Sequence, residues 1–176
     1  SRCYNIMSQI YTVKRLDSMA FEWQLKEIEL TEKYDLENYN ISQTYSQISS
    51  YYINTNQPEK ALEALKKADA TAYSPTQKIS VQLEYVNYYS KFEDMQAAEK
   101  ILNECKTAFD QDKRLWSIKK RLYNIEYVYY LQSKQYPKAL EAAKKQEAEE
   151  LNLSESIQNS VHYLTKGKIY SNMGNM

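Results

Sequence analysis

Apolar and polar residues alternate along much of this chain with the period of a helix. From Pro58 to Thr71 the apolar residues recur at helical spacing and charged residues fill the other face. The inward residues are Ala61, Leu62, Leu65 and Ala68, and the outward ones are Glu59, Lys60, Glu63 and Lys67. The stretch from Pro137 to Glu150 repeats the arrangement, with Ala139, Leu140 and Ala143 inward and Glu141 and Lys145 outward. Both stretches predict amphipathic helices.

A further helix is predicted after Asp17, which we expect to be its N-cap. Phe21, Leu25 and Ile28 form its predicted apolar stripe.

A tyrosine followed nine residues later by an alanine recurs four times. The pairs are Tyr11 and Ala20, Tyr52 and Ala61, Tyr89 and Ala98, and Tyr130 and Ala139. The alanines are spaced 41, 37 and 41 residues apart, and Tyr170 stands near the end without a following alanine. A period near 40 is typical of stacked helical units rather than of one globular core. We therefore predict an all-α fold, a right-handed α-solenoid of antiparallel helical hairpins.

The pattern predicts nine helices in about four and a half repeats. The first helices of the hairpins are expected at Cys3–Val13, Leu36–Asn54, Thr76–Lys91, Lys113–Ser133 and Ser154–Asn172, and the second helices at Asp17–Tyr34, Pro58–Thr71, Met95–Gln111 and Pro137–Leu151. These form one solenoid over residues 1–176, with units at 1–35, 36–74, 75–112, 113–152 and an incomplete 153–176. Pro58, Pro75 and Pro137 all fall where a helix begins, a position that tolerates proline. Because the fifth unit lacks its second helix, we expect the chain to be a fragment of a longer protein.

Composition argues against nucleic acid and membranes as partners of this segment. Lys plus Arg and Asp plus Glu both number 23, so no overall charge attracts nucleic acid or an anionic membrane, and we predict no direct nucleic-acid partner. No apolar run approaches the length of a membrane span, so no membrane contact is expected in this segment. Cys3 and Cys105 lie in different units and are expected to be unpaired, with Cys105 a small buried side chain.

Residues that could carry catalysis are scarce. His162 is the only histidine and has no cysteine, aspartate or second histidine near it in the sequence. A phosphate-binding glycine loop is excluded by a total of two glycines. We therefore predict no catalytic, cofactor-binding or metal site, and a protein that is not an enzyme.

The repeat resembles that of tetratricopeptide-repeat proteins, in which W-x2-L-G-x2-Y is followed by A-x3-F. The second unit carries this pattern at Tyr45, Ile48, Ser49 and Tyr52, then Ala61 and Leu65, and the fifth at Tyr163, Lys166, Gly167 and Tyr170. Val86 and Tyr127 stand where the pattern has a small residue, and Glu126 and Lys166 where it has leucine. Either these units splay apart or the alignment slips there.

The long period is also similar to that of tetratricopeptide arrays in the sensing regions of bacterial signalling proteins, particularly of Bacteroides-like organisms, whose chains are rich in Asn, Lys and Tyr. This resemblance implies a piece of a regulatory protein such as a transcriptional regulator. It leaves the compartment open between the cytoplasm and a periplasmic sensor region.

The resemblance further implies a concave face, lined mainly by the first helix of each hairpin, that binds a partner. Its positions here are Asn5, Gln9, Thr12, Gln43, Ser46, Ser50, Asn54, Leu83, Asn87, Ser90, Arg121, Asn124, Val128, Gln132, Leu164 and Lys168. Amides and hydroxyls dominate this set and can pair with the backbone of an extended peptide. The alternative is that these positions are solvated outward residues. The lysine clamp of some family members has no counterpart, because Ser46 and Asn87 stand in its place.

Two functions follow as hypotheses. The first is a non-catalytic module that binds a protein or peptide on the concave face, as the sensing or scaffold region of a larger regulatory protein. The alternative is a structural scaffold that self-associates into a homodimer through the incomplete fifth hairpin. A dimer formed through Tyr163 to Tyr170 could also result from truncation.

Overall fold

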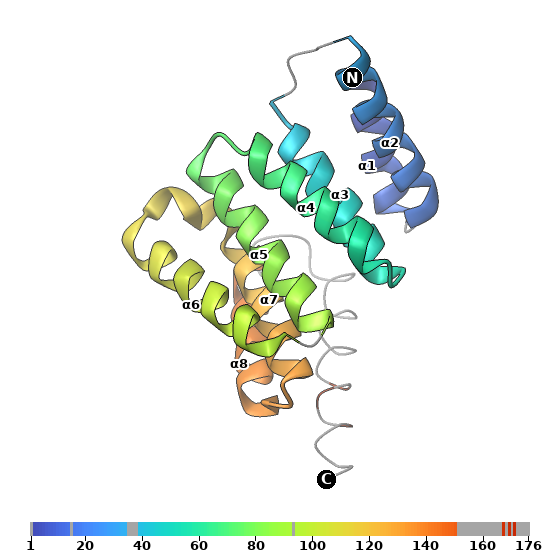
Figure 1. Cartoon of the computed structure of the whole chain (residues 1–176). Coiled ribbons are helices and arrows are strands. Elements are labelled where there is room, and N and C mark those ends of the chain that lie inside the picture. The colour runs from blue at the N-terminus through green and yellow to red at the C-terminus, as the bar shows by residue number, and fades with distance from the viewer. Residues whose placement is uncertain are drawn as a thin grey trace. The chain divides into compact units, whose positions relative to one another are not determined.

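The computed structural model describes residues 2–14, 16–34, 39–92 and 94–150, together with residues 167, 169 and 171. These residues form helices joined by short turns, and none of them forms a strand (Figure 1). The elements are α1 (Arg2–Val13), α2 (Asp17–Lys33), α3 (Ile41–Asn54), α4 (Pro58–Thr71), α5 (Pro75–Lys91), α6 (Met95–Gln111), a 3₁₀ segment η1 (Lys113–Ile118), α7 (Lys119–Gln132) and α8 (Tyr136–Glu150). The predicted all-α fold of consecutive helical hairpins is confirmed.

Contacts along the chain divide it into two compact units. Unit 1 covers residues 1–84 and unit 2 covers residues 85–176, so the division falls within helix α5. Unit 1 contains the hairpins α1–α2 and α3–α4, and unit 2 contains α6, η1 and the hairpin α7–α8. That all repeats stack into one continuous solenoid stays a prediction. The predicted ninth helix lies outside the described residues, apart from helical Gly167, Ile169 and Ser171.

A chain of two backbone hydrogen bonds explains the nine-residue spacing. In every hairpin the tyrosine carbonyl accepts from the N–H five residues later: Leu16, Gln57 and Asp94 donate to Tyr11, Tyr52 and Tyr89 at 2.9 Å, and Gln135 donates to Tyr130 at 2.8 Å. The carbonyl of that fifth residue then accepts from the alanine N–H, at 3.0 Å in all four cases. The first bond closes the turn and the second begins the next helix. The nine-residue spacing is therefore set by backbone hydrogen bonds and does not depend on the tyrosine ring.

Two of these turns end their first helix in a Schellman motif. Asn56 and Lys134 have φ angles of 58° and 59°, the left-handed conformation that usually requires glycine. Their N–H groups donate to the carbonyls of Ile53 and Leu131, at 3.2 and 3.3 Å, beside the bonds of Gln57 and Gln135. These paired bonds satisfy carbonyls that the end of a helix leaves without partners. Asparagine tolerates this conformation better than lysine does.

The alanines of the repeat are the contact points of the hairpins. Ala61, Ala98 and Ala139 are fully buried and Ala20 nearly so. In the α3–α4 hairpin, Ser49 and Ser42 reach the carbonyls of Ala61 and Ala68, at 3.0 and 2.8 Å. Small side chains on both helices therefore allow the backbones to approach closely. In unit 2, Ala139 and Ala143 pack with Tyr136 and Ile169, and the half-buried Tyr127 lies against this cluster.

Most helix boundaries agree with the predicted ones within two residues, and α4 and α6 agree fully. The three prolines all lie in the first turn of α4, α5 or α8. Helix α3 begins at Ile41 instead of Leu36; residues 35–38 lie outside the described part of the chain. Asp17 is the first residue of α2 rather than its N-cap, which is Leu16 and makes no side-chain cap bond.

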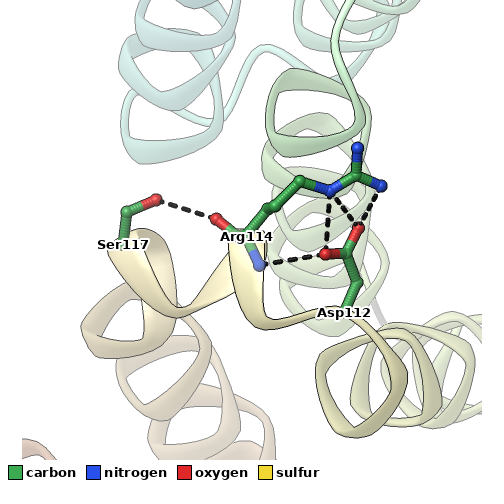
Figure 2. A network of polar contacts seen from close by, with 3 residues as sticks. All are labelled: Asp112, Arg114 and Ser117. Carbon is green, nitrogen blue, oxygen red and sulfur yellow. Dashed lines mark hydrogen bonds and ion pairs between the residues drawn. The ribbon is translucent and has the colours of Figure 1, made fainter.

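The corner between α6 and α7 differs from the continuous helix predicted from Lys113. Residues Lys113–Ile118 form a 3₁₀ segment, and the α-helix begins only at Lys119. Figure 2 shows the polar contacts that hold the corner: Asp112 accepts from the Arg114 backbone N–H at 2.9 Å and pairs with its guanidinium at 2.7 Å. The Ser117 hydroxyl donates to the Arg114 carbonyl at 3.3 Å. The hydrogen bonds from Arg114 lower the pKa of the Asp112 carboxyl.

The buried face of α2 is more polar than its apolar pattern predicts. Its buried residues are Ala20, Gln24, Glu27, Ile28 and Thr31. Leu25, predicted to face inward, is exposed. Gln24 is held by Ser8 of α1 and Gln47 of α3, at 3.1 and 3.0 Å. Buried amides are stable when they are hydrogen-bonded in this way, so partners from other helices decide which face of α2 is covered.

Candidate interaction surfaces

The predicted binding positions are divided between the two units. In unit 1, Gln9, Gln43 and Asn54 are exposed, whereas Asn5 and Ser50 are partly buried. Gln9 donates to the Asn5 side chain at 2.8 Å. Ser50 donates to the carboxylate of Glu84 at 2.6 Å, and that carboxylate is itself buried. The exposed amides fit a binding surface, while Ser50 serves first to hold a buried charge.

Ser46 and Leu83 do not reach the surface of unit 1. Ser46 is 3% exposed and its hydroxyl donates to the Ser42 carbonyl at 3.0 Å, while Leu83 has no exposed area. Ser90, from the same predicted face but in unit 2, is also buried. Their place in the repeat predicted a groove position, but the packing of neighbouring helices covers them. These three residues are corrected to interior positions.

In unit 2 the predicted positions are of mixed exposure. Asn124 is exposed, and Asn87, Arg121 and Val128 are partly buried. Asn87 and Arg121 both take part in interactions within the chain. Lys168 lies outside the described residues, as do Leu164 and the stretch Tyr163 to Tyr170 through which self-association was predicted, apart from residues 167 and 169.

A trough of about 310 Å³ opens in unit 1 between the first hairpin and helix α3. It gathers Thr12, Ser50 and Asn54 from the predicted set. The other lining residues are Asp17, Ala20, Gln24, Gln47, Tyr51 and Thr55. Asp17 is the single charged residue in this lining. Tyr51 forms one wall, with its ring stacked on Phe21 at 4.0 Å between centroids. The trough is therefore neutral over most of its surface, with amide and hydroxyl groups beside an aromatic wall.

A cation and a carboxylate of unit 2 form an ion pair between helices α6 and α7. Lys106 of α6 lies 2.9 Å from Glu126 of α7, whose side chain is only 7% exposed. Lys106 compensates the charge of this buried carboxylate. Burial by itself would lower the pKa of Lys106, but the hydrogen bond and charge of Glu126 outweigh it and raise the pKa overall.

Two cavities of unit 2 share this ion pair and Lys145. One, of about 400 Å³, is lined further by Tyr130, Lys138 and Glu141. Lys145 lies 2.8 Å from Glu141, and Lys138 donates to the neutral amide of Gln135 at 2.8 Å. The hydrogen bond to Glu141 raises the pKa of Lys145. Lys106 and Lys145 of this first cavity therefore both have carboxylate partners within its lining.

The second cavity, of about 410 Å³, lies beside the 3₁₀ corner. Phe109 and Leu122 supply apolar surface, and Trp116, Lys119 and Tyr123 form its wall. Trp116 is 56% exposed, although tryptophan is large and apolar. The Lys113 and Lys119 ammonium groups each lie 5.7 Å from its ring centroid. Within the described residues, no group of three or more His, Cys, Asp or Glu side chains is arranged to bind a metal ion.

Comparison with known proteins places the chain in a family. The family model of the 26S proteasome subunit RPN7 matches residues 12–144, which is most of the chain. The chain belongs to the RPN7 family. The matched region runs from the end of α1 into α8 and includes the unit 1 trough and, apart from Lys145, the lining of the second cavity of unit 2. No curated protein and no solved structure gave a significant match.

A helical-repeat protein was predicted and is confirmed by the match to the family of a proteasome subunit. That the repeats are tetratricopeptide repeats of a bacterial regulator stays a prediction. None of the described helices of this RPN7-family chain combines the length and apolar character needed to cross a bilayer.

The surface around Trp116 was not among the positions predicted from the sequence. A signal was present, because residues 113–125 contain five basic residues and no acidic one in a chain with no net charge. The exposed Trp116 lies between the basic residues Lys113 and Lys119. The predicted groove positions came from the first helix of each hairpin, whereas this surface begins at the 3₁₀ corner before α7. A search for aromatic residues within runs of one charge would have found it.

Proposed function

We propose that this chain is a non-catalytic protein-interaction module and that the unit 1 trough binds an extended segment of a partner protein. The match to the RPN7 family supports a protein partner, because the family is named for a subunit of a large assembly. We choose the trough as the binding site because three of the predicted binding residues, Thr12, Ser50 and Asn54, line this one cavity.

The chemistry of the trough suits a peptide backbone. Asn54 is exposed at its edge and offers both a donor and an acceptor. Tyr51 and Ala20 provide apolar surface against which a partner side chain can pack, and a cavity of this size accommodates a small number of side chains. With Asp17 as the single charged lining residue, binding would depend little on salt. A sensing or scaffold role within a larger regulatory protein belongs to the same proposal.

Peptides selected from a random library on the immobilised chain would test this function. A selected peptide, made synthetically, should bind the wild-type chain and lose about tenfold in affinity on Asn54→Ala, a loss expected for one hydrogen-bonding contact at the edge of an interface. Because Asn54 is exposed, its truncation should leave the melting temperature within about 1 °C of the wild type.

The matched control is Gln96→Ala, which truncates an exposed amide of α6 in unit 2. This variant should bind the selected peptide as the wild type does. If no peptide is selected, or if the selected peptides bind Asn54→Ala with undiminished affinity, the trough is not the binding site and the proposal is wrong.

A further inference from the structure

We propose that the unit 1 trough takes a basic side chain, arginine or lysine, of the partner segment. The trough presents mainly hydrogen-bond acceptors together with one carboxylate, and a basic side chain combines donors and a positive charge with no acceptor of its own. This inference rests on the proposed function, because it names the chemistry of the segment that the trough binds. It adds which side chain of that segment the trough selects.

The hydroxyl groups of the trough have no proton left for a partner. A hydroxyl has one hydrogen to donate and two lone pairs that accept. The hydroxyls of Thr12 and Thr55 each donate to the backbone carbonyl four residues earlier, at 3.0 and 2.9 Å. The hydroxyl of Ser50 donates to the carboxylate of Glu84 at 2.6 Å. Towards an occupant of the trough, these three hydroxyls can therefore act only as acceptors.

The amide of Gln24 is committed in the same direction. Its nitrogen donates to the hydroxyl of Ser8 and to the side-chain oxygen of Gln47, at 3.1 and 3.0 Å. Both N–H groups of that nitrogen are thereby used, and the amide oxygen remains as an acceptor. The amides of Gln47 and Asn54 keep N–H groups that can donate to the backbone of the segment. Acceptors therefore outnumber donors among the side chains that line the trough.

Asp17 supplies the charge. It is exposed at the first residue of α2, and no described residue forms a hydrogen bond or an ion pair with its carboxylate. The partial positive charge at the N-terminus of a helix is only about half an elementary charge, so the negative charge of the carboxylate is in excess. The trough therefore carries a negative charge that a basic side chain of the partner complements.

The aromatic wall of the trough suits the same side chain. Phe21 stacks on one face of the Tyr51 ring, with 4.0 Å between centroids and 13° between planes, and Tyr52 meets that ring edge-on. These contacts hold the ring in place. An aromatic ring attracts a cation, and the methylene stem of arginine or lysine can pack on apolar surface such as Ala20. The stem, the charge and the donors of a basic side chain are thus all matched by the lining.

Other side chains fit the trough less well. A glutamate would place its carboxylate among acceptors and beside Asp17, which repels it. An apolar side chain would cover the oxygens of Thr12, Ser50 and Thr55 without donating a hydrogen bond to them. A neutral amide can donate to these oxygens but brings no charge to Asp17. The lining therefore favours a basic side chain over these three classes.

The peptides selected from the random library provide the test. They should be enriched in arginine or lysine, and one of them is synthesised with an acetylated N-terminus and an amidated C-terminus, so that its charge resides in its side chains. Replacing its basic residue by glutamine should weaken binding to the wild-type chain about tenfold. Asp17→Asn should weaken binding of the original peptide about fivefold, and should leave the affinity of the glutamine-substituted peptide unchanged. Isothermal titration calorimetry measures all four affinities.

The matched control is Glu29→Gln, which removes an exposed carboxylate of the same helix outside the trough lining. This variant should bind the original peptide as the wild type does, and an equal loss would reduce the effect of Asp17 to general attraction between opposite charges. A merely structural role of Asp17 would weaken the original and the glutamine-substituted peptide equally. Either result overturns the inference.

Failure of this inference and failure of the proposed function give different results. If no peptide is selected, or if Asn54→Ala leaves the affinity undiminished, the trough is not the binding site and both proposals are wrong. If the selected peptides lose affinity on Asn54→Ala but are not enriched in basic residues, the trough binds a segment without selecting a basic side chain. The proposed function then stands, and this inference is wrong.

Discussion

The two units share one backbone frame but present opposite surface chemistry. Both contain the tyrosine-to-alanine chain of hydrogen bonds, a buried alanine in the second helix and a Schellman turn. Yet Asp17 is the single charged residue lining the unit 1 trough, whereas five charged residues line the second cavity of unit 2. Because backbone bonds and small residues build the frame, the remaining side chains can differ without changing the fold. The hairpins therefore give the architecture, and the two units differ in the side chains that line their cavities.

The largest expected contrast between the units is in thiol reactivity. Burial, with a smaller contribution from Glu104, raises the pKa of the Cys105 thiol to about 12, whereas Cys3 is exposed. The thiolate is the reactive form, so at pH 8 only about one Cys105 in ten thousand is reactive. A disulfide reagent should modify Cys3 at least about a thousandfold faster than Cys105, measured by mass spectrometry over time. In urea, both should react at similar rates; fast labelling of Cys105 in the folded chain would contradict its burial.

The same pKa shift has a consequence for stability at alkaline pH. The folded chain keeps Cys105 protonated above the pH at which the unfolded chain ionises it, so this contribution to stability is complete below about pH 9 and is lost as pH rises towards 12. The free energy of unfolding should therefore fall over this range, and less steeply in Cys105→Ala.

Overpacking the alanines would test whether the two units share their frame. Ala61→Leu in unit 1 and Ala139→Leu in unit 2 each force a larger side chain into a fully buried position, and each should cost about 3 kcal/mol of unfolding free energy in urea titration. Ala70→Leu and Ala148→Leu enlarge exposed residues of the same two helices and should change it by less than about 0.5 kcal/mol. A large loss in one unit alone would show that the frames are not equivalent.

The ion pair between Lys106 and the buried Glu126 of unit 2 tests how much burial adds to the energy of an ion pair. Lys106→Met leaves the carboxylate of Glu126 without its cation and should cost about 2 kcal/mol, a value reduced because the Lys106 side chain is 41% exposed. Glu126→Leu, alone or with Lys106→Met, should lie within about 1 kcal/mol of the wild type. In unit 1, Lys67→Met removes a partner of the exposed Glu63 and should cost less than about 0.5 kcal/mol. Equal losses for Lys106→Met and Lys67→Met would show that burial of Glu126 has no energetic weight.

The smallest expected difference lies in the turns. Lys134→Gly should stabilise the chain by about 1 kcal/mol, because lysine at positive φ carries a steric penalty that glycine avoids. Asn56→Gly should change stability by only a few tenths of a kcal/mol, since asparagine already tolerates this conformation. Thermal unfolding of both variants measures the difference. A gain at Asn56 equal to that at Lys134 would remove the distinction between the two turns.

Patterns of residues close in sequence predicted the helices and their turns well. The alanines, the prolines and the charge pattern of α4 depend on residues close in sequence, and their positions agree with the structure. The ion pairs of Lys67 with Glu63 and Lys145 with Glu141 follow from the same helical spacing.

Positions that depend on contacts between helices were harder to predict. Gln24 is buried because Ser8 and Gln47 satisfy its amide, and no pattern within α2 contains that information. Ser46 and Leu83 are likewise buried, although their places in the repeat predicted a surface position. The corner around Trp116 was not predicted either: Lys113–Ile118, capped by Asp112, form a 3₁₀ segment where a continuous α-helix was expected.

The backbone chain of the hairpin turn has a consequence for how such proteins can change in length. One residue inserted between a tyrosine and its alanine would rotate the following helix by about 100° and move the alanine away from its partner helix. Connections between hairpins obey no such count, as the spacings of 41, 37 and 41 residues between alanines already show. Insertions and deletions among relatives should therefore accumulate between hairpins, while the nine-residue step within each hairpin stays constant.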